Sequence, residues 1–152
     1  MKLQRAIAGI LMSFLFVFLS TGFGSIAVGQ SSPENVAIKG YDPVAYFKDN
    51  KPLQGNESST FPWHNMTWYF STKENRDLFA ASPEKYAPQF DGYCSWAMTE
   101  SRKALTDPEV WKIVDGKLYL NCSRAAYEKW ITDIPGNIKK ANENWLKLGG
   151  GK

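Results

Sequence analysis

The feature that most restricts the fold is a hairpin signal in the C-terminal half of the chain. Asp115-Gly116 lies between two apolar runs, 111–114 and 117–120. An Asp-Gly pair in this position favours a two-residue type I′ turn, which joins antiparallel strands. Ser123 then stands at a helix N-cap position, and apolar residues recur at helical spacing up to Ile131. The sequence therefore predicts a hairpin followed by a helix.

A second hairpin signal lies earlier in the chain. Residues 61–64 and 67–70 are rich in aromatic residues that favour strands, with a turn expected near Asn65-Met66. Ser71 and Glu74 have the spacing of a capping box, which predicts a helix after this hairpin as well. No internal repeat is evident in the residues, although both hairpins precede a helix.

Turn and cap signals place the remaining elements. Asp42-Pro43 breaks two short apolar runs, and Ser82-Pro83 is typical of a helix start. Asp107-Pro108 is interpreted as another such start, and Gly136 as the residue that separates off the last helix. We expect an α+β fold in which small antiparallel hairpins pack with three to four short helices on one side.

The N-terminus has the pattern of a signal peptide over residues 1–29. Lys2 and Arg5 precede an apolar stretch, 6–19, and the small residues Ala27-Val28-Gly29 form a cleavage pattern. The apolar stretch is short for a membrane span, so an uncleaved anchor is the less favoured alternative. The sequence predicts an exported protein, periplasmic or secreted, with no stable membrane anchor after cleavage.

Removal of residues 1–29 leaves a length that suits one domain with a modest core. We expect a flexible segment over 30–35, the domain over 36–148 and a frayed tail over 149–152. The formal charge falls from +3 to +1, because the removed segment carries Lys2 and Arg5 and no acidic residue. A chain so close to neutral has no electrostatic footprint for nucleic acid. A monomer or weak dimer is expected.

Two cysteines, Cys94 and Cys122, follow the predicted cleavage site. In an oxidising compartment the default expectation is a disulfide between them. The alternative is that one or both remain free thiols and bind a metal. Because no Cys-x-x-Cys sequence occurs, a thioredoxin-like redox role is disfavoured.

The candidate metal ligands are Cys94, Met98 and His64. Cys94 and Met98 are four residues apart, which on a helix places both sulfur atoms on one face. His64 is the only histidine and lies on the aromatic hairpin near Met66. Thiolate, thioether and imidazole together suit Cu(I). The competing interpretation is that Met98 belongs to the core and that His64 is a surface or structural residue.

Catalysis receives little support from the sequence. A cysteine nucleophile needs a base, and His64 is the only imidazole that could serve Cys94. No oxyanion-hole motif accompanies them, so we expect no enzyme and no catalytic residues.

Several segments in order resemble the YHS domain family, in particular its exported single-domain branch. They are Gly40 to Phe47, Trp68 to Phe79, Pro83 to Tyr86, Gly92 to Cys94, Asp107 to Trp111 and Asp115 to Asn121. The resemblance extends from about Val36 to Trp145. It implies a YHS-like fold and a link to heavy-metal handling, copper especially.

The resemblance does not carry the family's metal thiols to this chain. Where the metal-linked members place cysteines, this sequence has Ala45, Ser71 and Asn75. The matching thiol is Cys94, in the Gly-Tyr-Cys element, whereas Cys122 departs from the family pattern. A soft-metal site of the inherited kind is therefore not expected.

These observations lead to two hypotheses for function. The first is an exported YHS-type binding module that takes copper or another soft metal through Cys94. The second is a structural or protein-interaction domain, without metal, in which Cys94 and Cys122 form a disulfide. The expected partner is accordingly a soft metal ion or another protein.

Overall fold

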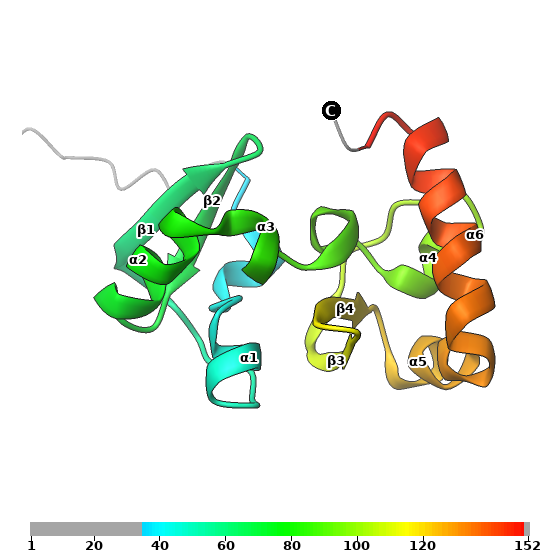
Figure 1. Cartoon of the computed structure of the whole chain (residues 1–152), viewed down its shortest axis with the longest axis horizontal. Helices are drawn as coiled ribbons and strands as arrows, with labels where there is room; N and C mark the ends of the chain where they lie inside the picture. Colours follow the sequence, from blue (N-terminus) through cyan, green and yellow to red (C-terminus); the bar gives the residue numbers. More distant parts are fainter. Residues whose placement is uncertain (1–34, 151–152) are drawn as a thin grey trace, which may run out of the picture. The chain divides into compact units, whose positions relative to one another are not determined.

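The computed structural model describes residues 35–150, and these form a mixed structure of hairpins and helices (Figure 1). The predicted α+β class is confirmed. The predicted signal peptide, most of the predicted flexible segment and residues 151–152 lie outside the described residues. Within residues 35–150 no helix has the length and apolar character that a membrane span requires.

The first half of the described chain begins with a 3₁₀ turn. It then contains one hairpin and three short α-helices. Figure 1 shows these elements in cyan and green on the left. In order they are η1 (Ala37–Gly40), α1 (Ala45–Lys48), β1 (Asn56–Trp63), β2 (Met66–Phe70), α2 (Lys73–Ala81) and α3 (Pro83–Tyr86).

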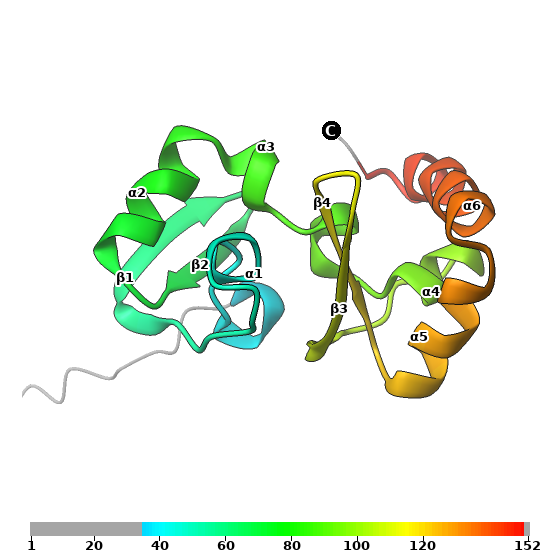
Figure 2. The same cartoon turned by 60° about the horizontal axis from the view of Figure 1, so that its bottom comes forward.

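The second half repeats this order of turn, helix, hairpin and helix. Its elements run from green to red on the right of Figure 1, and Figure 2 separates them from another direction. They are η2 (Gln89–Gly92), α4 (Ser95–Thr99), β3 (Asp107–Val114), β4 (Lys117–Asn121), α5 (Arg124–Trp130), η3 (Ile131–Asp133) and α6 (Ile134–Lys147).

The two antiparallel hairpins have the same strand register. Each residue pair of the first hairpin has an equivalent pair 51 residues later in the second. Both ladders are irregular after their outermost pair. The corresponding pairs are Asn56–Phe70 and Thr60–Tyr69 in the first hairpin, and Asp107–Asn121 and Trp111–Leu120 in the second. Asn56 and Asp107 also act alike, since each side chain accepts the backbone N–H of the residue two positions on, at 3.1 and 3.0 Å.

The flanking elements follow the same plan. After the hairpins, the hydroxyls of Thr72 and Ser123 each accept a backbone N–H three residues later, at 3.1 and 3.2 Å, and so begin α2 and α5. Before the hairpins, η1 and η2 contain left-handed residues and end in Gly40 and Gly92. The molecule is therefore an internal structural repeat. It was not predicted from the sequence, because few side chains are identical in the two halves; different polar residues accept the same backbone N–H groups.

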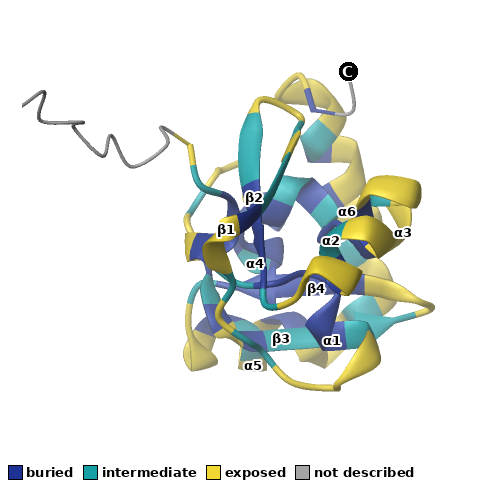
Figure 3. Ribbon diagram, turned by 90° about the vertical axis from the view of Figure 1, so that its left-hand side faces the viewer, coloured by how far each residue is buried: buried dark blue, intermediate teal, exposed yellow. Residues whose placement is uncertain are grey.

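The second hairpin lies between the two main apolar clusters. Leu118 and Leu120 face a cluster built from the first half, whereas Tyr119 between them faces the cluster with Trp130 from α5. Alternate residues of a strand point to opposite faces, so one strand serves both clusters. Figure 3 shows β4 coloured as buried over most of its length.

Tyr46 ties the first half to β3. Its hydroxyl donates to the backbone carbonyl of Pro108 at 3.0 Å, and its ring meets Trp111 edge-on, with centroids 5.2 Å apart. Burial raises the pKa of the Tyr46 hydroxyl far above its ordinary value. Tyr46 therefore links the first half directly to the second hairpin.

Two local predictions for the first hairpin are wrong by one residue. The turn is formed by His64 and Asn65, with φ of 51° and 57°, not by Asn65 and Met66. The cap of α2 is Thr72, because the hydroxyl of Ser71 is bound elsewhere, to the carboxylate of Asp42.

Two predictions in the second half also need correction. The segment from Asp107 begins strand β3 rather than a helix. Helix α6 starts at Ile134, before Gly136, because the carboxylate of Asp133 accepts the Gly136 N–H at 3.1 Å. At the C-terminal end of α6, the backbone N–H of Gly150 donates to the carbonyl of Trp145 at 2.9 Å.

Candidate functional site

The first half holds a buried carboxylate that organises its surroundings. Oδ1 of Asp42 accepts the backbone N–H groups of Val44 and Ala45 at 2.8 and 3.3 Å. Oδ2 accepts the Ser71 N–H at 2.9 Å, the Ser71 hydroxyl at 2.6 Å and the Asn75 amide at 2.7 Å. The three residues that the YHS resemblance would place at thiol positions, Ala45, Ser71 and Asn75, thus converge on Asp42. Here they supply hydrogen bonds to an anion.

Cys94 takes the place of Asp42 in the second half. Its sulfur accepts the backbone N–H of Ala97 at 3.5 Å, at the start of α4, and that of Cys122 at 3.2 Å. Its thiol donates to Oδ1 of Asn121 at 3.9 Å. The side chain is completely buried beside Ala97 and Ala126. The structure therefore brings together two cysteines that are 28 positions apart in the chain.

Both cysteines are free thiols in the structure, with Cys94 buried and Cys122 half-buried. Burial raises the pKa of the Cys94 thiol. The backbone N–H groups of Ala97 and Cys122 act in the opposite direction, while hydrogen bonding with the Cys122 thiol raises the pKa further. Cys94 is therefore kept protonated by its apolar surroundings, but its sulfur already has two N–H donors that suit a negative charge.

The other predicted metal ligands lie elsewhere. Met98 is buried in the cluster with Phe90, Tyr119 and Trp130 rather than in the cluster of Cys94. The His64 imidazole bonds to Asp91. Across residues 35–150, no three or more His, Cys, Asp or Glu side chains gather as a metal group. Among the hydrogen-bond partners of Cys94 within residues 35–150 are Ala97, Asn121 and Cys122, and His64 is not one of them.

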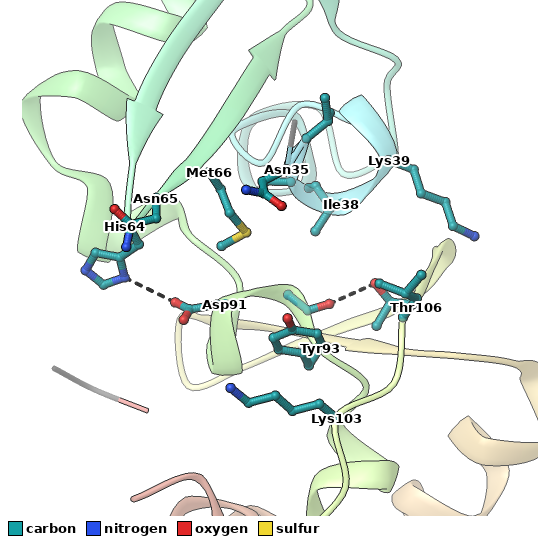
Figure 4. A pocket seen from close by; sticks show the side chains of 14 residues that line it. Asn35, Ile38, Lys39, His64, Asn65, Met66, Asp91, Tyr93, Lys103 and Thr106 are labelled. Atoms are coloured by element: carbon teal, nitrogen blue, oxygen red, sulfur yellow. Dashed lines mark hydrogen bonds and ion pairs between the residues drawn. The ribbon is translucent and has the colours of Figure 1, made fainter. Parts of the chain in front are cut away.

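A cavity of about 440 Å³ lies where elements of both halves meet. From the first half it is lined by η1 and by the turn between β1 and β2. From the second half it is lined by the end of η2 and by the loop before β3. Figure 4 shows the labelled side chains around this space. Its volume is within the range of small-molecule sites.

The His64–Asp91 pair joins the two halves at the wall of the cavity. Nδ1 of His64 lies 3.2 Å from Oδ1 of Asp91 (Figure 4). The imidazole also stacks on Trp63, with ring centroids 3.6 Å apart and an angle of 11° between the planes. The contact with Asp91 and the stack on Trp63 together fix the orientation of the imidazole.

Lys103 is the second positioned polar group of the cavity. Its ammonium lies 5.3 Å from the ring centroid of Tyr93 and 5.0 Å from that of Trp145. Two aromatic faces thus hold one cation at the cavity wall. The sequence analysis missed Asp91, Tyr93 and Lys103. The sequence offered one signal for this site, because His64-Asn65 is an energetically unfavourable pair for a type I′ turn. The turn was instead predicted one residue later, at Asn65-Met66.

Family models, curated proteins and solved structures were all compared with this chain, and none matches. The resemblance to the YHS family stays a prediction.

Proposed function

We propose that this protein is an exported binding module of the YHS type, without catalytic activity, that binds Cu(I) or another soft metal ion through Cys94 and Cys122. The observation that carries the proposal is the 3.2 Å hydrogen bond from the Cys122 N–H to the Cys94 sulfur. It supports the proposal because sulfur ligands select soft metal ions and this contact brings the two cysteines side by side. Cys122 replaces Met98 and His64 in the predicted ligand set.

The chemistry of this pair fits a soft ion of low coordination number. Two backbone N–H groups on the Cys94 sulfur would remain to stabilise the thiolate that a metal requires. Burial opposes the thiolate until the metal is bound. Metal binding therefore displaces protons, and the affinity is expected to rise with pH.

A Cu(I) titration under anaerobic, reducing conditions tests the proposal. The wild-type protein is expected to take up one Cu(I), and Cys122→Ser and Cys94→Ala to take up none. Met98→Leu serves as the matched control because it removes a neighbouring sulfur from the core without touching the pair. Unchanged stoichiometry in Cys122→Ser, the variant at the less buried site, would exclude the thiol pair as the metal site.

The same contact favours a second candidate, a disulfide-linked structural or protein-interaction domain. Joining the two sulfurs releases two protons and two electrons, which the disulfide of an exchange partner accepts. A thiol count on the denatured, unreduced protein distinguishes the two candidates. Two free thiols contradict the disulfide, whereas none contradicts the metal-thiolate site.

A further inference from the structure

The two cysteines of the thiol pair differ in how they can be reached from solvent. Cys94 is completely buried, whereas Cys122 is half-buried and is followed by three exposed residues, 123–125. The cluster around Cys94 includes Ala97 and Ala126, with Cys122 packed against its edge. A reagent in solution therefore reaches Cys122 before it reaches Cys94.

The internal repeat indicates that side chains at these two positions meet. The equivalents of Cys94 and Cys122 in the first half are Asp42 and Ser71, and the Ser71 hydroxyl donates to the Asp42 carboxylate at 2.6 Å. In both halves the backbone N–H of the later residue also donates to the side chain of the earlier one, at 2.9 and 3.2 Å. The shared backbone thus directs two side chains toward each other, and in the second half both end in sulfur.

The surroundings of the pair would tolerate a bond between the two sulfurs. A disulfide brings the sulfur atoms to about 2.05 Å, so both side chains must shift slightly. Ala126 stands where the first half has Asn75, so it makes no side-chain hydrogen bond that this shift would break. The hydrogen bond lost is the one from the Cys94 thiol to Asn121, and Oδ1 of Asn121 keeps the backbone N–H of Trp96 at 3.1 Å.

Two backbone N–H groups suit Cys94 to the thiolate form that thiol–disulfide exchange requires. The N–H groups of Ala97 and Cys122 lie 3.5 and 3.2 Å from its sulfur. In exchange a thiolate is both the attacking and the leaving group, and such donors stabilise it. Burial opposes the thiolate, but an attack on the neighbouring sulfur is intramolecular, which favours it.

We propose that the thiol pair exchanges with small-molecule disulfides in a fixed order, with Cys122 as the entry thiol and Cys94 as the resolving thiol. This inference rests on the second candidate function and deepens it, because it names the class of the exchange partner and the residue that the partner reaches first. A small disulfide needs no docking surface beyond access to Cys122.

The exchange proceeds in two balanced steps. The Cys122 thiol loses its proton, and its sulfur attacks one sulfur of the small disulfide; the disulfide bond of the reagent breaks and one thiolate leaves. The Cys94 thiol then loses its proton, and its sulfur attacks the Cys122 sulfur; the mixed disulfide breaks and the second thiolate leaves. The protein gives up two electrons and the reagent accepts them, while the two cysteine protons go to the two leaving thiolates.

Glutathione disulfide is the probe that tests this order. The full chain is reduced, freed of metal with a chelator, mixed with glutathione disulfide, and quenched with acid at increasing times for peptide mass mapping. In the wild type we expect glutathione on Cys122 first, and then the Cys94–Cys122 disulfide with no glutathione retained. Glutathione on Cys94 at early times overturns the order. A lasting adduct on Cys122 beside a free Cys94 overturns the resolving step, and no reaction of either thiol overturns the proposal.

Variants assign the two steps to the two residues. Cys94→Ala is expected to stop with one glutathione on Cys122. Cys122→Ser is expected to react more than about tenfold more slowly than the wild type, because its remaining thiol is reached only when the fold opens. Met98→Leu is the matched control and should react as the wild type does. Equal rates in Cys122→Ser and the wild type contradict the assignment.

Denatured protein shows whether the fold is the cause. In denaturant both cysteines are expected to take up glutathione at similar rates. The same preference for Cys122 in native and denatured protein would contradict burial of Cys94 as the reason for the order.

Failure of this inference can be distinguished from failure of the functions on the same site. If the purified protein has no free thiols but its reduced form does not react with glutathione disulfide, the second candidate stands and the exchange route is overturned. If the purified protein has two free thiols and its reduced form reacts in the expected order, the second candidate is contradicted and the exchange route stands. Cu(I) uptake is read separately, because the exchange is measured without metal.

Discussion

Asp42 and Cys94 occupy the same place in the two halves of the molecule. Each follows a Gly-Tyr pair, and each side chain accepts the backbone N–H three residues later at the start of a helix. Each also accepts the N–H of the residue that follows the hairpin, Ser71 in one half and Cys122 in the other. A sulfur thus stands in the second half where a carboxylate organises the first.

Replacing Asp42 with Asn is expected to cost about 3 kcal/mol in the free energy of unfolding, because five donors would face a neutral amide. Chemical denaturation measures this loss. Asp107→Asn is the matched control, since Asn56 already performs the same backbone contact in the first half. A comparable loss in both variants would contradict the role given to Asp42.

The reduced protein is expected to lose stability as the pH rises above about 8.5, the ordinary pKa of a thiol. The folded pKa of Cys94 is raised by burial, so the folded state keeps a proton that the unfolded chain has released. This contribution is complete below that pH and decreases above it. Denaturation between pH 7 and about 9.5, below the range in which tyrosines titrate, measures the slope.

The control for this pH dependence is Cys94→Ala, which has no thiol to titrate at that position. Its stability is expected to change less with pH over the same interval. An identical slope in the wild type and in Cys94→Ala would show that the Cys94 proton does not contribute.

Trp130→Phe is expected to cost about 1 kcal/mol less than Trp68→Phe. Both indoles are completely buried. Nε1 of Trp68 donates to the Trp63 carbonyl at 3.1 Å, whereas Nε1 of Trp130 has no partner within the described residues. The difference is the contribution of one hydrogen bond. Moreover, the position equivalent to Trp130 in the first half is Phe79. Equal costs in denaturation experiments would refute this explanation.

Gly92→Ala is expected to destabilise the fold more than Gly116→Ala. Both glycines are left-handed, with φ of 81° and 72°, so both variants bear a cost of about 1–2 kcal/mol. A Cβ on Gly92 would also lie 2.6 Å from Cγ2 of Ile38, whereas a Cβ on Gly116 meets nothing within 4 Å. Thermal unfolding distinguishes the two. Addition of Ile38→Ala to Gly92→Ala should recover part of the difference.

The secondary structure was predictable where one local signal decides it. Asp115-Gly116 turns the second hairpin, and Ser123 caps the helix after it, because neither residue is needed elsewhere in the fold. Ser71 misled the prediction for the opposite reason. Its hydroxyl has a stronger partner in Asp42, far away in sequence, so the cap passed to Thr72.

The candidate sites were less predictable because they depend on contacts between distant segments. The cysteines alone suggested a pair, but the choice of Cys122 over Met98 and His64 follows from the packing of β4 beside α4. The cavity combines a turn, a loop and η2 from separate parts of the chain. Only the unusual His64-Asn65 turn was visible beforehand, and its partner Asp91 was not.

Because of the internal repeat, each residue in one half can be compared with the residue at the equivalent position in the other half. Where the halves agree, as in the register of the hairpins and the caps after them, the residues serve the architecture. Where the halves differ, the shared backbone does not require the residue that one of them carries. Cysteine in place of aspartate, and His-Asn in place of Asp-Gly, are such divergences. The repeated backbone thus holds different side chains at a few positions without a change in its hydrogen bonds.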